Sequence, residues 1–259
     1  MDKRQLMLAG CVLALAMGMT SCVTKCDGLS FSPGELTTEV RPLTGFETIM
    51  ISGSPSVYYT QADSFSVVVK GPEHVVADIL TDVNDKQLVV RNRGKIGVLN
   101  FSRFDDEEVG VYVTSPDLTS IQLNGSGDFE AKQRVDTDNM TIVLRGSGDI
   151  DFKDIICDHC TTELVGSGDI EIGRLDSHTS TVSLIGSGDI KLKQWNVRET
   201  EVTLRGSGDI ALDFVEGCRT ADCQLTGSGD ITLRGHIGQY KGQKSGSGEI
   251  DTQKLSIEK

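Results

Sequence analysis

Positive charge and histidine are scarce in this chain of 259 residues. It has 25 Lys and Arg against 38 Asp and Glu, a formal net charge of −13, and only four His residues. Such a surplus of acid argues against the attraction to phosphate backbones on which nucleic-acid binding depends. It argues equally against attachment to anionic lipid through basic side chains. We therefore expect no nucleic-acid partner.

Long apolar runs are absent after residue 22. Before it, residues 6–17 form a run too short to span a bilayer, preceded by two basic residues and followed by small residues that end at Cys22. This pattern predicts a lipoprotein-type signal peptide over 1–21, with a lipidated Cys22 and a tether over 22–41; an ordinary signal peptide is the alternative. We expect an outer-membrane lipoprotein, bound to the membrane through its N-terminal lipid, on either the periplasmic or the surface face.

Helical periodicity is absent from the second half of the chain, where a different pattern recurs. Gly-Ser-Gly-Asp, with Glu replacing Asp in the last copy, occurs seven times at intervals of 19 to 21 residues. A period of about 20 residues with the same turn in every unit is typical of a repeat architecture. A sharp corner repeated in every unit needs positive-φ positions, which glycine supplies. The structural turn glycines are Gly125 and Gly127, Gly146 and Gly148, Gly166 and Gly168, Gly186 and Gly188, Gly206 and Gly208, Gly227 and Gly229, and Gly246 and Gly248.

Apolar residues alternate on both sides of each corner. The fifth position of the repeat is Phe or Ile, and the residue two before each corner is Leu in the first six copies. Period-two alternation predicts two short strands per unit, each with one face that stacking of the units buries. The predicted fold class is all-β: a right-handed parallel β-solenoid (β-helix) with about 20 residues per coil over 119–259. The alternative, a stack of antiparallel hairpins, lacks the tight two-residue turns that hairpins prefer.

The segment 42–118 repeats less clearly, and we interpret it as irregular N-terminal coils of the same domain. Gly53-Ser54 resembles a degenerate corner, and 73–85 fits either a short helix or another strand. At the other end, Lys244 replaces the Leu of the repeat, so we expect the apolar ladder to stop there. We also expect this lysine to discourage end-to-end stacking. The strands expected in the N-terminal half are Thr48–Ile51, Val57–Thr60, Phe65–Lys70, Gln87–Arg91 and Val109–Thr114.

Three segments carry a resemblance to a known family. They are Phe46-Glu-Thr-Ile-Met-Ile-Ser-Gly, Gln87-Leu-Val-Val, and Ser115-Pro-Asp-Leu-Thr-Ser-Ile-Gln-Leu-Asn-Gly-Ser-Gly-Asp. With the repeat, they make residues 42–259 resemble the bacterial family of the putative auto-transporter adhesin, head GIN domain. The resemblance implies a β-helical exported protein, often lipid-anchored. It brings no catalytic residues with it and fixes no ligand.

Acidic residues of the repeat form the sharpest candidate site. The Asp that ends each corner would stack into a column, and in the first three units the next outward position adds a second acid, with neighbours about 5–7 Å apart. Such crowding raises carboxylate pKa values unless a cation or turn N–H groups compensate. Calcium is the one candidate cofactor, and capping of the turn by the aspartates is the favoured alternative. The candidate cation strip is Asp128, Glu130, Asp149, Asp151, Asp169 and Glu171.

The sequence Cys157-Asp-His-Cys160 resembles a metal-binding or thioredoxin-like motif only superficially. Zinc needs four ligands, and only His159 lies close in sequence to Cys157 and Cys160. An exported protein sits where disulfides persist. We therefore expect either local disulfides or small buried thiols at Cys157, Cys160, Cys218 and Cys223.

No catalytic residue is predicted. A polysaccharide-active enzyme needs a defined pair of carboxylates in a cleft, whereas a regular column of acids is what a structural repeat produces. Trp195, the only tryptophan, lies in a variable turn, where it either stacks on a sugar or packs under a loop. The segment Arg91 to Glu108 breaks the rhythm of the coils and is the expected partner site, because irregular loops on rigid scaffolds commonly bind.

These patterns predict a lipid-anchored cell-envelope β-solenoid that acts as a binding, adhesion or scaffolding module for a protein or glycan ligand. A calcium-stabilised carbohydrate-binding envelope protein is the alternative, and a polysaccharide-active enzyme is less favoured. The sequence predicts no oligomeric state.

Overall fold

Strands of the repeat stack as parallel coils in the computed structural model, which describes residues 36–94, 103–104 and 107–257. All of these belong to one unit, Gly34–Lys259. The predicted signal peptide, Cys22 and the tether as far as residue 35 lie outside the described residues. Leu36–Arg41, expected to end the tether, instead forms strand β1. No helix among the described residues is long and apolar enough to cross a membrane.

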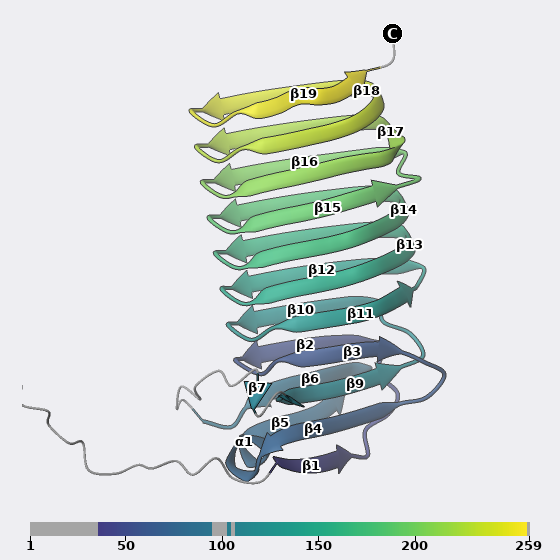
Figure 1. The fold of residues 1–259 in the computed structure, drawn as a ribbon, viewed down its shortest axis with the longest axis vertical. Helices are drawn as coiled ribbons and strands as arrows, with labels where there is room; N and C mark the ends of the chain where they lie inside the picture. The colour runs from purple at the N-terminus through teal and green to yellow at the C-terminus, as the bar shows by residue number, and fades with distance from the viewer. Residues whose placement is uncertain (1–35, 95–102, 105–106, 258–259) are drawn as a thin grey trace, which may run out of the picture. The chain divides into compact units, whose positions relative to one another are not determined.

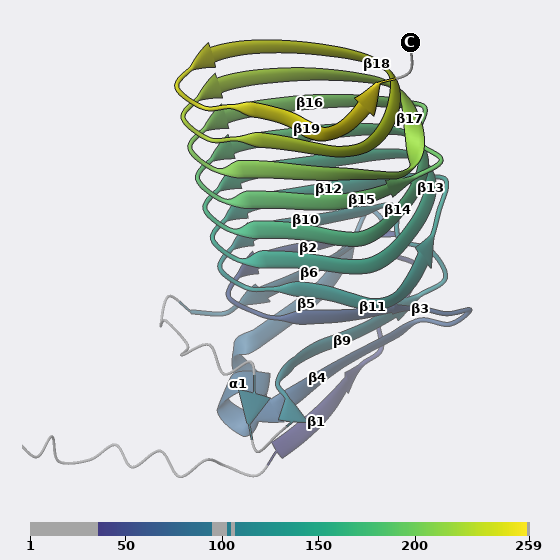
Figure 2. The ribbon, with the colours of Figure 1, turned by 45° about the horizontal axis from the view of Figure 1, so that its top comes forward.

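The regular coils follow the repeat closely. Successive strands pair in parallel and place like residues over like, so that Gly125 lies against Gly146 and Leu123 against Leu144. The stack is right-handed (Figure 2), which confirms the predicted fold class. The strands are β10 (Ser120–Gly125), β11 (Phe129–Asp136), β12 (Asn139–Gly146), β13 (Asp149–Gly166), β14 (Asp169–Gly186), β15 (Asp189–Trp195), β16 (Glu199–Gly206), β17 (Asp209–Gly227), β18 (Ile231–Gly246) and β19 (Ile250–Ile257).

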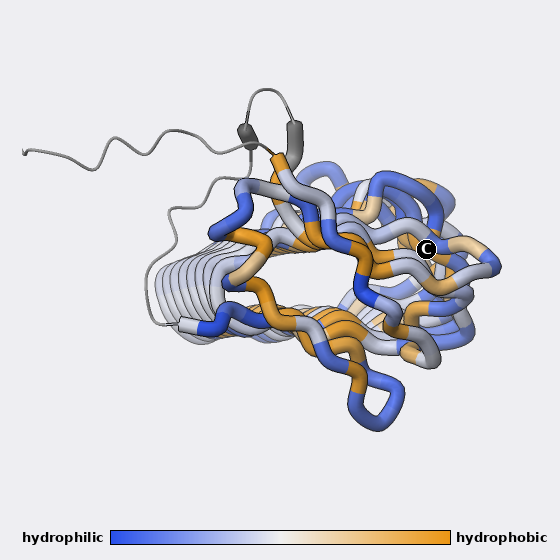
Figure 3. The backbone as a smooth tube through the Cα atoms, turned by 90° about the horizontal axis from the view of Figure 1, so that it is seen from below, coloured by the Kyte–Doolittle hydropathy of each residue, from blue (hydrophilic) through white to orange (hydrophobic). Residues whose placement is uncertain are grey.

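Apolar ladders fill the space between the two walls of each coil. Figure 3 shows hydrophobic residues along the inner sides of both walls. The Ile at the fifth position of the repeat and the Leu before each corner are at most 1% exposed from the second corner to the sixth. Alternation along the strand therefore sets which side chains are buried, as the period-two pattern predicts.

Two further coils continue the stack below the repeat. Strand β2 (Thr48–Gly53) pairs in parallel with β10 on one side and β6 (Gln87–Asn92) on the other. Strand β3 (Val57–Gln61) lies in the same way between β11 and β9 (Gly110–Ser115). Hence the coil of β6 and β9 lies beneath that of β2 and β3 (Figure 1). The chain that leaves β9 passes the level of β2 and β3 before it enters β10.

Antiparallel strands and a helix close the N-terminal end. Strand β4 (Ser66–Pro72) pairs with β9 and β1, and β5 (Ile79–Asn84) pairs with β6. Helix α1 (Glu73–Asp78) adds Val75 and Val76 to the core, so the undecided segment 73–85 holds a helix and then a strand. All five strands expected in this half are present. The two-residue strands β7 (Arg103–Phe104) and β8 (Glu107–Glu108) pair in the segment that separates β6 from β9.

The C-terminal end has no such cover among the described residues. From residue 241 to residue 247 every residue of the last coil is exposed, including Lys244 at the ladder position above Leu225. The apolar ladder therefore stops where the sequence predicts.

Candidate functional site

The two edges of the stack differ in character. Glycine corners stack evenly along one edge, whereas the turns along the other edge are hydrophilic and irregular (Figure 3). We call this second edge the variable edge; it comprises the turns around residues 136–138, 156–158, 176–178, 196–198 and 215–219, and residues 236–238.

At the glycine edge, the two glycines of a corner are required for different reasons. The first has a positive φ, between +121° and +146°, in all seven copies. The second is held by close approach, because a Cβ on Gly188 would overlap the carbonyl oxygen of Gly168. Between them, the serine N–H donates to the first glycine of the preceding coil, as from Ser187 to Gly166 at 2.9 Å. The corner is thus a structural element, as predicted.

The Asp column at this edge is a ladder of turn caps. One carboxylate oxygen of each Asp accepts the backbone N–H of the corresponding acid in the next coil, for example Asp189 N to Asp169 Oδ1 at 3.0 Å. The same bond joins every pair from Asp128 to Glu249, at 2.7 to 3.4 Å. This geometry supports capping as the main role of these carboxylates.

The candidate cation strip is assembled as a surface but not as a chelating site. By register, Asp151 lies between Glu130 and Glu171, and Lys132 pairs with Glu130 at 3.2 Å. Burial, followed by these two acidic neighbours, raises the pKa of Asp151, and burial with Asp128 and Asp169 nearby raises that of Asp149. Within the described ranges, no group of three or more Asp, Glu, His or Cys residues could hold a metal ion. Calcium binding stays a prediction.

Asp151→Asn is expected to stabilise the fold at neutral pH. Since folding raises the pKa of Asp151, the charged form costs stability above that pKa, and the cost vanishes as falling pH protonates the carboxyl in both states. We expect the variant to gain up to about 1 kcal/mol in free energy of unfolding at pH 7, in keeping with a largely exposed charge, and nothing at pH 3. Urea denaturation at the two pH values measures this.

Asp176→Asn is the matched control for that experiment. Partial burial alone would raise the pKa of Asp176, but hydrogen bonds from Asn196 and Arg174 hold it below its ordinary value. Stability from this carboxylate is present at pH 7 and lost as pH falls, so its Asn variant should lose stability at pH 7. Equal effects of Asp151→Asn at pH 7 and pH 3 would contradict the charge argument.

At the variable edge, the only tryptophan is covered by a cation. The guanidinium of Arg174 lies over the ring of Trp195, 4.8 Å from its centroid, and pairs with Asp176 at 2.9 Å. Asn196 donates to the same Asp176 at 2.7 Å. Trp195 is therefore packed within a polar cluster on that ring face, which favours the packing alternative over sugar stacking there.

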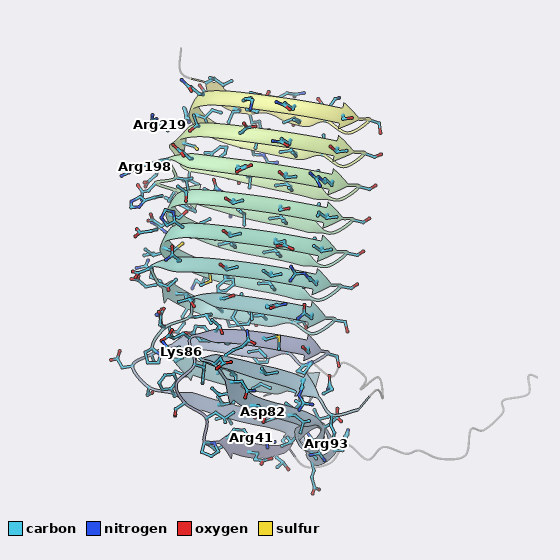
Figure 4. All side chains as sticks on the ribbon, turned by 180° about the vertical axis from the view of Figure 1, so that it is seen from behind. Arg41, Asp82, Lys86, Arg93, Arg198 and Arg219 are labelled. Carbon is cyan, nitrogen blue, oxygen red and sulfur yellow. The ribbon has the colours of Figure 1, made fainter. Side chains whose placement is uncertain are left out.

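Charge changes sign along the variable edge. A hollow in the lower coils is lined by Asp136, Asp138, Asp158, Asp176 and His178, and His178 Nδ1 lies 3.2 Å from Asp158 Oδ1. Further along, a second hollow is lined by Arg198, Arg219 and His236, with Glu216 as its one acid. Figure 4 shows Arg198 and Arg219 at the same edge, one coil apart. An adjoining polar hollow is lined in part by Glu199 and Thr220, the residues that directly follow Arg198 and Arg219 in the chain.

All four candidate cysteines are buried thiols that form no disulfide bond in this structure. Contact with Cys160, together with burial, raises the pKa of Cys157, and burial raises the pKa of Cys223 to about 12. Thiols with raised pKa values are poor nucleophiles at neutral pH. Disulfides between them stay a prediction.

Sequence reasoning placed its partner site elsewhere. Residues 95–102 and 105–106 of the segment Arg91 to Glu108 lie outside the described residues, so that prediction has no structural test. The arginine-lined hollow was missed, because Arg198 and Arg219 stand in turns where the repeat has no fixed residue. Their spacing of one coil was the available signal.

Comparison with known proteins gives one family. The sequence pattern of the family described as putative auto-transporter adhesin, head GIN domain matches residues 45–218 and 178–259. None of the curated proteins is significantly similar to the chain.

Solved structures share the fold. A putative adhesin from Bacteroides fragilis is 24% identical with a TM-score of 0.73, over 87% of this chain and 99% of that one. A putative adhesin and a putative lipid binding protein, both from Parabacteroides distasonis, are 19% and 22% identical with TM-scores of 0.64 and 0.63. They align over 87% and 84% of this chain and 98% of each of those chains.

Proposed function

Because the chain belongs to the family described as putative auto-transporter adhesin, head GIN domain, we propose that it is a lipid-anchored binding module of the cell envelope. The observation that carries the proposal is the contrast between the two edges. The glycine edge and the buried ladders use almost every repeated residue for folding. The variable edge, held on that rigid stack, carries the irregular turns, the hollows and the change in the sign of charge, and such loops are where binding is commonly placed.

The proposal gives the chain no catalytic role. Each aspartate of the column from Asp128 to Asp230 already accepts a backbone N–H from the next coil, so these acids are engaged in the fold. The family description, an adhesin, points the same way. A stack of this kind suits recognition of an extended ligand along its edge rather than enclosure of a small one.

Cys22→Ser is expected to release the protein from the membrane. If Cys22 carries the lipid, its replacement removes the acyl chains that hold the protein, since the chain has no other long apolar run. Metabolic labelling with a palmitate analogue should mark the wild type and miss the variant, which should move to the soluble fraction. Equal labelling of both would refute lipidation at Cys22.

Labelling intact cells with a membrane-impermeant amine reagent tests on which side of the outer membrane the protein lies. The described surface offers exposed lysines, including Lys132, Lys153, Lys191 and Lys254. We expect labelling comparable to that of a known surface protein, with a periplasmic protein as the negative control. Labelling that appears only after lysis would contradict surface display and leave a scaffold of the periplasm.

A further inference from the structure

We propose that the hollow lined by Arg198 and Arg219 binds the carboxylate of an acidic saccharide, and that the adjoining polar hollow binds its hydroxyl groups. The inference rests on the proposed binding function and gives that function a ligand class.

The two arginines have no polar side-chain partner among the described residues, although the chain is acidic overall. Both are exposed, and neither guanidinium forms a hydrogen bond or ion pair with another described residue, although Glu216 lines the same hollow. Each arginine directly precedes one member of the register pair Glu199 and Thr220, so the two lie at neighbouring levels of the stack. Two guanidinium charges at neighbouring levels of the stack repel each other. An anion between them relieves this repulsion, and a guanidinium matches a carboxylate in a bidentate arrangement.

The fold builds the hollow through local irregularity. The coil between Gly206 and Gly227 has an extra residue, and the register of β17 against β18 shifts between Phe214 and Cys218. Gly217 lies in this bulge with φ of +93°. Bulges of this kind re-aim side chains next to functional sites.

The backbone beneath the arginines is firmly held. The carbonyl of Arg198 accepts hydrogen bonds from the N–H of Thr220 at 2.9 Å and from its hydroxyl at 3.5 Å. The Cys218 thiol donates to the same carbonyl at 3.6 Å. Below them, buried Gln194 joins Ser180 and Thr200 through hydrogen bonds of 2.9 and 3.0 Å. The two guanidiniums thus extend from a rigid base.

The adjoining hollow determines the rest of the ligand. The outward-facing residues that line it carry hydroxyl or carboxylate groups: Thr179, Thr181, Glu199, Glu201, Thr220 and Asp222. Of the acids, Asp222 is paired with Lys241 at 2.7 Å, and Glu199 and Glu201 have no ion pair with a described residue. Carboxylates accept hydrogen bonds from sugar hydroxyls and repel a second anionic group. The surroundings therefore favour a saccharide with one negative charge over a polyanion or an acidic peptide.

Calorimetric titration of the purified full-length protein in detergent tests the proposal. The probes are sialyllactose and xylotriose bearing one glucuronate, with lactose and xylotriose as uncharged counterparts and a heparin hexasaccharide as the polyanion. We expect at least one carboxylated probe to bind, its neutral counterpart to bind at least about tenfold more weakly, and the heparin hexasaccharide to bind no better. Trp195 fluorescence is a second readout, because its neighbour Asn196 lines the hollow.

The double variant Arg198→Gln with Arg219→Gln should weaken that binding at least about tenfold. Its control is Lys153→Gln with Arg205→Gln, which changes the net charge equally at two exposed cationic residues outside the hollow; binding should stay within twofold of the wild type. Absence of binding by both carboxylated probes, tighter binding of heparin, or equal loss in the two double variants overturns the proposal. The membrane and cell-labelling results are read independently, so a failure here is distinct from failure of the proposed function.

Discussion

Gly188→Ala is expected to unfold the solenoid or break it in the middle. A Cβ at this position would overlap the carbonyl oxygen of Gly168 and stand 3.0 Å from Leu164 Cδ2. The corner cannot move aside easily, because backbone hydrogen bonds hold it on both sides. The N–H of Ser187 donates to the carbonyl of Gly166 below, and the N–H of Ser207 donates to the carbonyl of Gly186 above. Adding a methylene group to a well-packed core costs about 1–3 kcal/mol. A clash with backbone that every coil holds in register should cost at least the upper end of that range.

Urea denaturation followed by circular dichroism measures the loss, and limited proteolysis locates it. Each coil contacts mainly its neighbours, so we expect cleavage near residue 188 before cleavage elsewhere. Ser187→Ala is the control: its side chain is exposed and makes no hydrogen bond with a described residue, so its stability should stay within about 0.5 kcal/mol of the wild type. If Gly188→Ala unfolds at the same urea concentration as this control, the close-approach argument is wrong.

The parallel stack was predictable because the same physical demand recurs in every coil. Ile170, Ile190 and Ile210 occupy one ladder and Leu164, Leu184 and Leu204 another, and each ladder is visible in the sequence as a fixed spacing from a glycine corner. The glycines themselves mark the positions where the backbone turns and where adjacent coils approach too closely for a side chain. Repetition multiplies a weak local signal until it specifies the fold.

The N-terminal coils were harder to predict, since their order in space departs from their order in the chain. Strands β2 and β3 lie between β10 and β11 above and β6 and β9 below, so consecutive strands of the sequence skip a level. No regular spacing of residues in the sequence reveals that a level is skipped. The cap is equally local: Asp85 and Lys86 adopt positive φ in the turn that lets β5 fold back antiparallel to β6.

The candidate site shows the same division. The Asp column was identified from its repetition, and repetition is also why its main role is structural: the same carboxylate caps the same turn in every coil. Arg198 and Arg219 occupy no fixed position of the repeat and are marked in the sequence only by their spacing of one coil. Their significance depends on the register and on their lack of an ion pair with a described residue. Neither the register nor the missing ion pairs can be seen in the sequence.

Phe152→Ala is expected to cost about 3–5 kcal/mol in free energy of unfolding. The side chain is fully buried, and its ring centroid lies 5.1 Å from that of Phe129. In its column Phe152 lies between Ala131 and Ile172, so it fills space that the small Ala131 leaves open. Truncation would set two alanines side by side, and the neighbouring backbones, fixed at the strand spacing of about 4.8 Å, have little freedom to collapse into the cavity.

Ile172→Val in the next coil is the matched control, because it removes one methylene group from the same column and should cost about 0.5–1.5 kcal/mol. Urea denaturation of both variants against the wild type gives the two values. A cost for Phe152→Ala no larger than that of Ile172→Val would mean that the column relaxes around the missing ring. The regular coils would then behave as deformable layers, and the rigidity on which the arginine hollow depends would have to come from its hydrogen bonds alone.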